Sequence, residues 1–523
     1  MIAGYIRLVG PAAVQVILRL NGRDVVKTWS TVNVAEPGQQ AFRFNLKGLW
    51  SYVRDHDVLT VASGGQEVTV ATDGLRKPKA FDPDVLFRKL AAGHIFNQLG
   101  VLQLSKMHDI GWQKDTLNFY DTLRNVFKSK LDYELTACYG TMLGAVRSES
   151  FIGHDHDFDS CYISRETTHQ GVRYELRQIG LALVHLGFQV VARKSCLWVY
   201  QRPKPINRLV SKFLGVRKKI KIDIFHLYFD ADGVLQFPFG TVGAGNFLQS
   251  DFTGYGDAKI TPDRSVRVIE DRKKFAEQIY GPGWVNPNPG FNWARDRTKN
   301  VPKAMLTTVE QSEVYWSNFY ASKEFAPGST FCAFILKSDY ACKSVVDIGC
   351  GDGRDTFAFA QAGVNALGLD RSEEAVERAT VRAAQNGLAG KIRFAVCDVS
   401  QSQMLDENFA KAVKDTAVGA PLMYYARFFL HSITAAMETT LLTAIAATAR
   451  SGDILALEFR TSEDELEKKV HGAHFRRFLV VPNLMASLES KFGFAIRYHF
   501  EGKGLSPYKD EDPHLCRIIA QKM

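Results

Sequence analysis

The chain has 523 residues, of which 46% are hydrophobic and 23% charged, with a net charge of +9. This length exceeds what one hydrophobic core supports, so we expect about two to four domains. The composition excludes a disordered or fibrous chain. The moderate basic excess favours phosphate-bearing or anionic partners without requiring nucleic acid.

Cysteine usage and the N-terminal segment indicate where such a protein resides. Eight cysteines are scattered with neither a CxxC pair nor a paired His and Cys spacing. This pattern predicts reduced, mostly buried thiols in a cytoplasmic protein, not a disulfide framework or a zinc site. The segment MIAGYIRLVG lacks the pattern of a secretory signal, and no apolar run is long enough to span a membrane. We therefore expect a soluble, non-secreted protein.

Residues 1–75 alternate apolar and polar side chains in short runs, separated by turn signals such as Asn21-Gly22 and Pro37-Gly38. This pattern predicts a small antiparallel β-sandwich. It contains no cluster of reactive side chains, so we expect an accessory module for packing or glycan contact. The polar segment from Thr72 to Pro83 is typical of a linker.

Helical spacing of apolar residues follows in 84–96 and 114–128 and leads into the stretch 137–163, ACYGTMLGAVRSESFIGHDHDFDSCYI. If residues 157–159 form a strand, Asp157 and Asp159 project from the same face. Two adjacent carboxylates repel unless a hard cation lies between them, and Mg²⁺ or Mn²⁺ suits such ligands when phosphates complete its shell. The DxD spacing by itself is common in loops and helix caps.

The whole stretch resembles the LicD/fukutin-type nucleotidyltransferase-like family, whose hallmark is YGTLLGAVR followed by an acidic run. Tyr139 to Arg147 fits it, and the acidic run here contains Asp155, Asp157 and Asp159. His156 stands where many members have Asp, and Gly153-His154 replaces the usual Pro-Trp.

A predicted helix at 172–186 and strand at 188–192 precede the basic stretch 202–221. That stretch is either a solvated face or a landing site for phosphates or an anionic membrane surface. The next strand, 220–225, carries Asp223 within an apolar run. A lone buried carboxylate is costly unless paired or metal-bound, so Asp223 is a candidate third carboxylate of the site.

The resemblance extends over residues 85–298 and includes FAEQIYGPGWV at 275–285. It implies an α/β nucleotidyltransferase-like domain that transfers a phospho-alcohol, such as phosphocholine or a polyol phosphate, from a CDP-activated donor to a sugar hydroxyl. It further implies that Asp157, Asp159 and Asp223 hold the metal, with Asp223 alternatively orienting the acceptor hydroxyl. Gly140 and Thr141 would cradle phosphate, and Arg147 would neutralise charge or serve as a structural ion-pair partner.

A second centre lies in residues 310–523, where the apolar strand and glycine-rich turn VVDIGCGDG occupy 345–353. A helix and a further strand follow, and that strand ends at Asp370. A third strand ends at Asp398. Glycines at a strand-to-helix turn let a nucleoside approach the backbone, and an acid after the second strand can accept ribose hydroxyls. A Rossmann-like domain for another nucleotide is the alternative.

This order resembles the class I S-adenosylmethionine-dependent methyltransferases, which have a Rossmann-like α/β fold. The resemblance implies S-adenosylmethionine as cofactor. Asp370 would bind its ribose and Asp398 its adenine amino group. The methionine part would lie beside a set of residues in the first strand and turn, namely Asp347, Gly349, Gly351 and Gly353.

Residues after the fourth predicted strand, 421–425, face the substrate in such enzymes. His431 is therefore a candidate general base, or else a packed, hydrogen-bonded histidine. Arg427, Arg476 and Arg477 are candidates for binding an anionic acceptor. The segments YWSNFY and RFFLHSI resemble those of methyltransferases that act on bacterial surface polysaccharides.

The sequence as a whole predicts a bifunctional cytoplasmic transferase that adds a phospho-alcohol to a glycan or lipid-linked oligosaccharide and methylates the glycan or the added group. The first alternative is a polysaccharide methyltransferase with a non-catalytic LicD-like glycan-binding module. The second is a nucleotidyltransferase joined to an RNA methyltransferase. No aromatic-rich basic recognition stretch supports that second alternative.

Overall fold

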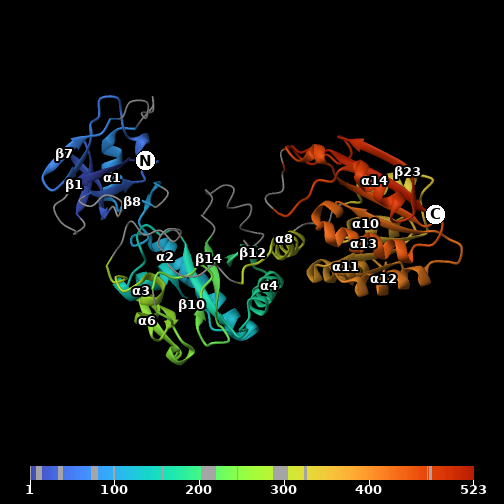
Figure 1. Cartoon of the computed structure of the whole chain (residues 1–523), viewed down its shortest axis with the longest axis horizontal. Helices are drawn as coiled ribbons and strands as arrows, with labels where there is room; N and C mark the ends of the chain where they lie inside the picture. The colour runs from blue at the N-terminus through green and yellow to red at the C-terminus, as the bar shows by residue number, and fades with distance from the viewer. Residues whose placement is uncertain are drawn as a thin grey trace. The chain divides into compact units, whose positions relative to one another are not determined.

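The computed structural model describes residues 2–7, 14–32, 39–71, 81–97, 100–155, 157–201, 220–243, 245–286, 304–322, 327–467, 469 and 474–523. The chain forms two compact units, shown with their elements in Figure 1. The first comprises Met1–Leu176 with Ser195–Met305, and the second Arg177–Lys194 with Leu306–Met523. The division falls inside the expected 85–298 domain, within helix α4 (His169–His185).

The first unit begins with short antiparallel strands, as their alternating pattern predicts. One sheet has the order β1-β5-β4 and the other β3-β2-β6-β7. Their bounds are β1 (Ile2–Arg7), β2 (Gln15–Leu20), β3 (Arg23–Trp29), β4 (Thr31–Val32), β5 (Gln39–Phe44), β6 (Leu59–Ser63) and β7 (Gln66–Thr69). Val16 and Leu18 of β2 share a core with Phe44 of β5.

Helix α1 (Pro83–Ala91) departs from the expected boundary, because it buries Leu86 and Phe87 in the core of these two sheets. The family resemblance, which begins at residue 85, places this helix in the following α/β domain. Asp82 caps the helix by accepting the N–H of Asp84 at 2.8 Å. The helix thus completes the N-terminal core, and the short hairpin of β8 (His94–Phe96) and β9 (Leu102–Leu104) comes after it.

The remainder of the first unit is built around strands in the order β10-β11-β14-β13, with β15 paired to β14. β11 and β14 run parallel, while β13 and β10 are antiparallel to their neighbours. The strands are β10 (Thr136–Ala137), β11 (Phe158–Ser164), β13 (Cys196–Tyr200), β14 (Lys221–Phe229), β15 (Leu235–Gln236), β16 (Tyr255–Thr261) and β17 (Arg264–Ile269). The helices are α2 (Ile110–Val126), α3 (Tyr139–Ser148) and α6 (Arg272–Tyr280). Helix α3 packs on β11.

The second unit contains a seven-stranded sheet of order β20-β19-β18-β21-β22-β24-β23, in which β24 runs antiparallel to both β22 and β23 and the other pairings are parallel. Its strands are β18 (Ser344–Ile348), β19 (Asn365–Asp370), β20 (Ile392–Val396), β21 (Leu422–Arg427), β22 (Ile454–Arg460), β23 (Phe494–Gly502) and β24 (Leu515–Lys522). The strand order reverses at β18, as in doubly wound folds. The Rossmann-like fold expected for the C-terminal region is present.

Helices cover both faces of this sheet because its buried strands have apolar side chains on both sides. Val346 faces the core that contains α12 and α13, whereas Val345 faces the core that contains α9. The helices of the unit are α8 (Thr308–Ser322), α9 (Thr330–Lys337), α10 (Arg354–Gln361), α11 (Glu373–Gln385), α12 (Ser402–Asp415), α13 (Ala435–Thr448) and α14 (Val481–Ser490). Strand β12 (Gln189–Ala192) also belongs to this unit and packs against α8.

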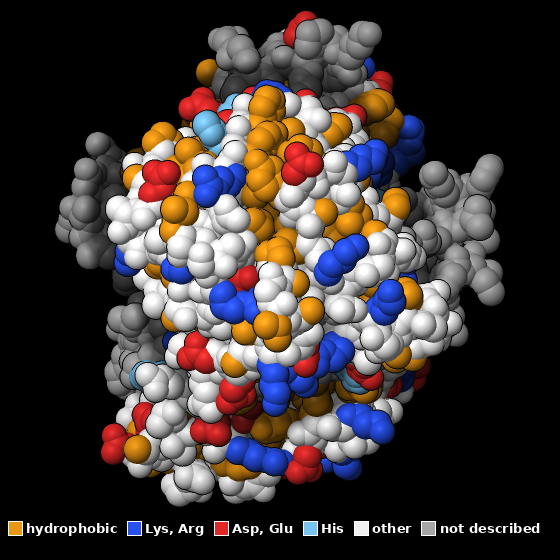
Figure 2. Space-filling view, turned by 90° about the vertical axis from the view of Figure 1, so that its right-hand side faces the viewer, with side chains coloured by type: hydrophobic (Ala, Val, Ile, Leu, Met, Phe, Trp, Pro, Cys, Tyr) orange, Lys and Arg blue, Asp and Glu red, His pale blue; other side chains and the backbone are white. Residues whose placement is uncertain are grey.

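On the face shown in Figure 2, Lys and Arg side chains are mixed with Asp and Glu side chains. A band of hydrophobic side chains runs over the upper half of this face. Such mixing of signs agrees with the moderate net charge. Among the described helices, none has the length and apolar character needed to cross a bilayer.

Asp453, which is 1% exposed, stabilises the second unit by accepting the backbone N–H groups of Leu422 and Arg450, each at 2.8 Å, and by pairing with the Arg450 guanidinium. We expect Asp453→Ala to lower the free energy of unfolding by about 2–4 kcal/mol, because it leaves buried donors unpaired. Urea denaturation followed by circular dichroism measures the change. Asp415→Ala, at an exposed ion pair with Arg393, is the control and should cost under about 0.5 kcal/mol. Equal losses of unfolding free energy in the two variants would contradict the stabilising role of Asp453.

Candidate functional site

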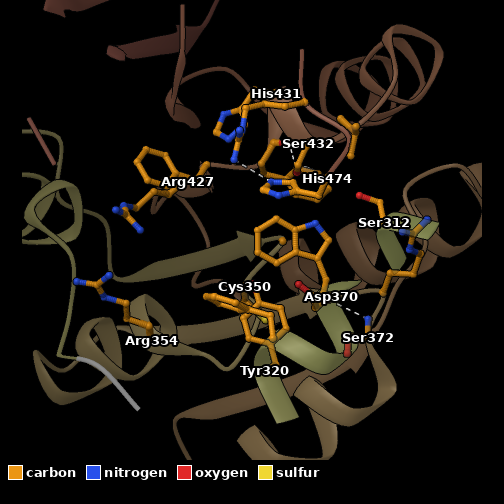
Figure 3. A pocket seen from close by; sticks show the side chains of 18 of the residues that line it. Ser312, Tyr320, Cys350, Arg354, Asp370, Ser372, Arg427, His431, Ser432 and His474 are labelled. Carbon is orange, nitrogen blue, oxygen red and sulfur yellow. Dashed lines mark hydrogen bonds between the residues drawn. The ribbon is translucent and has the colours of Figure 1, made fainter. Parts of the chain in front are cut away.

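A cavity of about 490 Å³ in the second unit lies where the strand order reverses. Parallel strands bring their carboxyl ends to one edge of a sheet, and the reversal leaves a crevice there. The lining includes residues at these strand ends: Asp347 from β18 and Gly349 just after it, Asp370 from β19, Asp398 after β20, Arg427 from β21 and Arg460 from β22. Figure 3 shows Asp370, Ser372 and Tyr320 at one end and Arg427, His431 and His474 at the other.

The glycine-rich turn after β18 is held against Asp370. The two carboxylate oxygens of Asp370 accept the N–H groups of Gly351 and Ser372, each at 2.8 Å. Gly349 has φ +71°, and a Cβ there would lie 2.1 Å from the Phe429 ring. Glycine is therefore required for this close approach. Burial raises the pKa of Asp370, although the two N–H groups oppose that shift.

Asp347, predicted to lie beside the cofactor, is buried and accepts a hydrogen bond from Thr356 Oγ1 at 2.6 Å. Burial and the nearby Asp355 carboxylate raise the pKa of Asp347 to about 8. Asp355 is itself satisfied by Ser329 and by the Tyr425 hydroxyl, at 2.6–2.8 Å. Asp347 and Gly349 line the cavity, whereas ring carbons of Tyr320 and Phe394 pack over Gly351 and Gly353. Asp398 lines the cavity and accepts the Ser400 N–H at 2.9 Å.

Buried ion pairs build the opposite end of the cavity. Glu458, with no exposed surface, accepts Arg427 Nε at 2.9 Å and Arg517 Nε at 2.6 Å. Arg460 pairs with Asp464 and Glu511, each at 2.5 Å. Such pairs keep buried guanidinium groups charged and fixed in place.

His431, the candidate base, lines the cavity and is 5% exposed. Its Nδ1 accepts the backbone N–H of Arg460 at 3.2 Å. Burial, and then the charges of Arg460 and Arg476, lower the pKa of His431 well below its usual value. The ring is packed and hydrogen-bonded, and its lowered pKa favours the neutral form. Its role as a general base stays a prediction.

The three predicted acceptor-binding arginines are placed differently. Arg427 and Arg476 line the cavity. Arg477 does not: its Nε donates to the Ile433 carbonyl at 2.6 Å, and its Nη2 pairs with Glu438. The Arg477 side chain thus holds the segment before α13, and its role in acceptor binding stays a prediction.

Aromatic residues of α8 form one wall of the cavity. Trp316, Phe319 and Tyr320 all line it. The His474 ring stacks on Tyr315, with centroids 4.7 Å apart, and packs edge-on against Trp316. By its sequence, the motif YWSNFY at 315–320 indicates only a family likeness. Its spacing of about one helical turn between Trp316 and Tyr320 could have indicated a shared face.

In the first unit, the predicted carboxylates do come together. One carboxylate oxygen from each of Asp155, Asp157 and Asp159 lies within 4.8 Å of the others. Asp159 is directly opposite Asp223 in the parallel pairing of β11 and β14. Burial, and then the nearby carboxylates, raise the pKa of Asp159 well above its usual value, and burial raises that of Asp223 to about 6.

Lys221 was missed as a member of this cluster. Its Nζ lies 3.1 Å from Asp157 Oδ2 and 2.8 Å from Asp223 Oδ1, and 4.5 Å from the Trp198 ring centroid. Lys221 and Asp223 are two apart on β14, so the period of a strand was the signal available in the sequence. The ammonium group offsets part of the negative charge here.

The residues of the expected phosphate cradle, Gly140 and Thr141, lie in the first turn of α3. Their role in binding phosphate stays a prediction. Both contact Asp159, since the Gly140 N–H donates to its Oδ2 at 3.1 Å and the Thr141 Oγ1 accepts its N–H at 2.8 Å. No ion pair of Arg147 with a described residue is present, and burial lowers the pKa of Arg147. His156 and nearly all of the basic stretch 202–221 lie outside the described residues, so contact with a membrane through it stays a prediction.

The cavity of the second unit suits S-adenosylmethionine, and the acidic cluster of the first unit suits a divalent cation. The cavity combines a glycine turn, a ribose-accepting carboxylate and an acidic end that favours a positively charged cofactor such as S-adenosylmethionine. The cluster of Asp155, Asp157 and Asp159 offers the oxygen ligands that Mg²⁺ or Mn²⁺ prefers, and a cation would relieve the burial of Asp159.

Comparison with known families supports a methyltransferase domain in the second unit. Residues 341–473 match a family model described as "Methyltransferase domain". The 23S rRNA (uracil(1939)-C(5))-methyltransferase RlmD of Acidithiobacillus ferrooxidans is 36% identical over 89 residues, which are 17% of this chain and 20% of that protein. Sterol 24-C-methyltransferase erg-4 of Neurospora crassa is 27% identical over 109 residues, 18% of this chain and 28% of that protein. The chain thus spans less than a third of these relatives.

Solved structures with similar chains include a SAM-dependent methyltransferase from Anabaena variabilis, with 16% identity and a TM-score of 0.33, covering 42% of this chain and 96% of that one. Another, from Methanosarcina mazei, has 18% identity and a TM-score of 0.28, covering 34% of this chain and 92% of that one. The assignment of a methyltransferase domain rests on the family model and the strand order.

Replacing Lys221 should make the stability of the first unit depend more strongly on pH. Without the ammonium group, the pKa of Asp223 rises further above about 6. The folded state then binds protons that the unfolded state releases above about pH 4, so stability falls as pH rises. We expect Lys221→Met to cost about 2–4 kcal/mol at pH 8 and less at pH 4.5.

Urea unfolding followed by tryptophan fluorescence at both pH values measures this difference, with Lys259→Met, an exposed lysine on β16, as control. A loss that is larger at pH 4.5 than at pH 8 would contradict the ion-pair role.

Proposed function

We propose that the second unit binds S-adenosylmethionine and transfers its methyl group to an acceptor. The observation that carries this proposal is the cavity at the strand reversal, with the Gly349–Gly353 turn tied to Asp370, inside the segment that matches the methyltransferase family model.

Each residue of the cavity has a defined task in this proposal. Asp370 accepts the ribose hydroxyls, Asp398 the adenine amino group, and Asp347 with Gly349 borders the methionine part. The bound cofactor supplies a methyl group on a sulfonium, which is already an excellent leaving group. The chain therefore contributes alignment more than acid or base chemistry.

The acidic cluster supports a second function, metal-dependent transfer of a phospho-alcohol from a CDP-activated donor to a glycan or lipid-linked oligosaccharide. Asp155, Asp157 and Asp159 hold the divalent ion that binds the donor diphosphate, and Asp223 with Lys221 sets the local charge. The two units then modify the same surface glycan, one by phospho-alcohol transfer and the other by methylation.

The two alternative functions make different experimental predictions. A LicD-like part that only binds glycan predicts that Asp157→Ala leaves every activity unchanged. A nucleotidyltransferase joined to an RNA methyltransferase predicts RNA binding with a steep salt dependence.

Asp370→Ala should weaken cofactor binding, because it removes the carboxylate for the ribose and frees the Gly351 turn. We expect affinity for S-adenosylhomocysteine to fall at least about tenfold, or about 1.4 kcal/mol. Isothermal titration calorimetry measures it, with Asp415→Ala as a control outside the cavity. Unchanged affinity in a folded Asp370→Ala protein would contradict the proposed ribose contact.

Asp157→Ala should abolish phospho-alcohol transfer and leave S-adenosylhomocysteine affinity unchanged. Protein is incubated with Mg²⁺, a panel of CDP-linked alcohols and an oligosaccharide acceptor, and mass spectrometry follows CMP release and acceptor mass. Glu149→Ala, on the same segment outside the cluster, is the control. CMP release by Asp157→Ala at the wild-type rate would contradict the metal role.

A further inference from the structure

The cavity of the second unit is electrically polarised. One end has more acidic than basic side chains, with the carboxylates of Asp347, Asp352, Asp355, Asp370 and Asp398 beside Arg354 and Arg371. The other end has more basic side chains, with Arg427, His431, Arg460, His474 and Arg476 beside Glu511, and three of these basic residues are labelled in Figure 3. A positively charged cofactor is favoured at the first end, and a negatively charged group at the second.

The arginines of the basic end differ in how their charge is balanced. Arg427 is paired with Glu458, and Arg460 with Asp464 and Glu511. Arg476 makes no ion pair with any residue in the described part of the chain, and its Nε is buried with no hydrogen-bond partner there. Arg476 is thus the guanidinium at this end with charge and donors left for a ligand.

Neighbouring groups hold the Arg476 guanidinium in position. Its Nη2 lies 3.1 Å from His474 Nε2. The His474 ring is in turn fixed between Tyr315 and Trp316, with centroid distances of 4.7 and 4.9 Å. This arrangement presents an oriented guanidinium beside an aromatic wall, which suits a planar or apolar group that carries an anion.

The hydrogen bond to His431 decides which ring nitrogen carries its proton. Because Nδ1 accepts the Arg460 N–H, the neutral ring has its proton on Nε2. Protonating Nδ1 would set two donors against each other, so the ring is poor at accepting a proton. His431 therefore offers a fixed N–H donor at the cavity.

We propose that the basic end of the cavity binds an oxyanion of the methyl acceptor, a carboxylate or a phosphate, through Arg476 and the Nε2–H of His431. His431 is then an acceptor-binding donor and not a general base. This inference rests on the proposed methyltransferase function, since it identifies the class of molecule that the enzyme methylates.

Calorimetric titration of the full chain tests the subsite, with and without saturating S-adenosylhomocysteine. The probes are benzoate, phenyl phosphate and the neutral benzamide. We expect an anionic probe to bind at least about tenfold more tightly than benzamide, and Arg476→Gln to remove that preference while S-adenosylhomocysteine affinity changes less than about twofold. Preference for benzoate or for phenyl phosphate identifies the oxyanion.

Arg393→Gln, an exposed arginine outside the cavity, is the matched control and should bind every probe as the wild type does. Equal binding of benzoate, phenyl phosphate and benzamide, or anion binding retained in Arg476→Gln, overturns the inference. Failure of S-adenosylhomocysteine to bind overturns the proposed function separately, because the anion titrations without it still report on the subsite.

The ¹⁵N resonances of the His431 ring give a second test, because they would not respond to anion binding if His431 were only structural. In protein with ¹⁵N-labelled histidine, assigned by comparison with His431→Gln, we expect the neutral Nε2–H form throughout pH 6–8. We also expect a shift of the Nε2 resonance when the tighter anionic probe is added. An imidazolium at pH 7, or no shift on anion binding, contradicts the donor role.

Discussion

The reversal of strand order at β18 is the constraint on which the functional architecture of the second unit depends. Parallel strands end at the same edge, and helices that diverge from either side of β18 leave a crevice there. Side chains at these strand ends surround one cavity although they are far apart in sequence, as Asp370 and Arg460 do. The polarity of the cavity follows, since acidic residues end the strands on one side of β18 and basic residues end those on the other.

Burial of charge organises both units in the same way. A buried ion is tolerated where partners satisfy it, and Glu458 with Arg427 and Arg517 shows such a network. Other buried charged groups lack such partners in the described part of the chain, and these groups indicate where a ligand would bind. Asp159 lies among other carboxylates, and Arg476 has a buried Nε without a described partner. These are the positions where we place a cation and an oxyanion.

Much of this organisation could be predicted from the sequence, because it depends on neighbours along the chain. The turn VVDIGCGDG with Asp370 and Asp398 predicted the fold of the C-terminal region, since strand, glycine turn and acid occur at set distances. The acidic run likewise predicted that Asp157 and Asp159 lie together. Other features were not foreseen: α1 packs in the N-terminal core, Gly140 and Thr141 begin a helix, and the Arg477 side chain binds Ile433 and Glu438.

The sequence by itself determined the element types, the glycine turn and the presence of two acidic motifs, because local periodicity and backbone freedom are properties of short segments. Only the tertiary structure decided how charges are paired. Lys221 lies beside Asp157 although 64 residues separate them, and the backbone N–H of Arg460 sets the tautomer of His431 across 29 residues, so spacing along the chain does not encode these contacts. The availability of Arg476 to a ligand is likewise a consequence of which carboxylates its neighbours already hold.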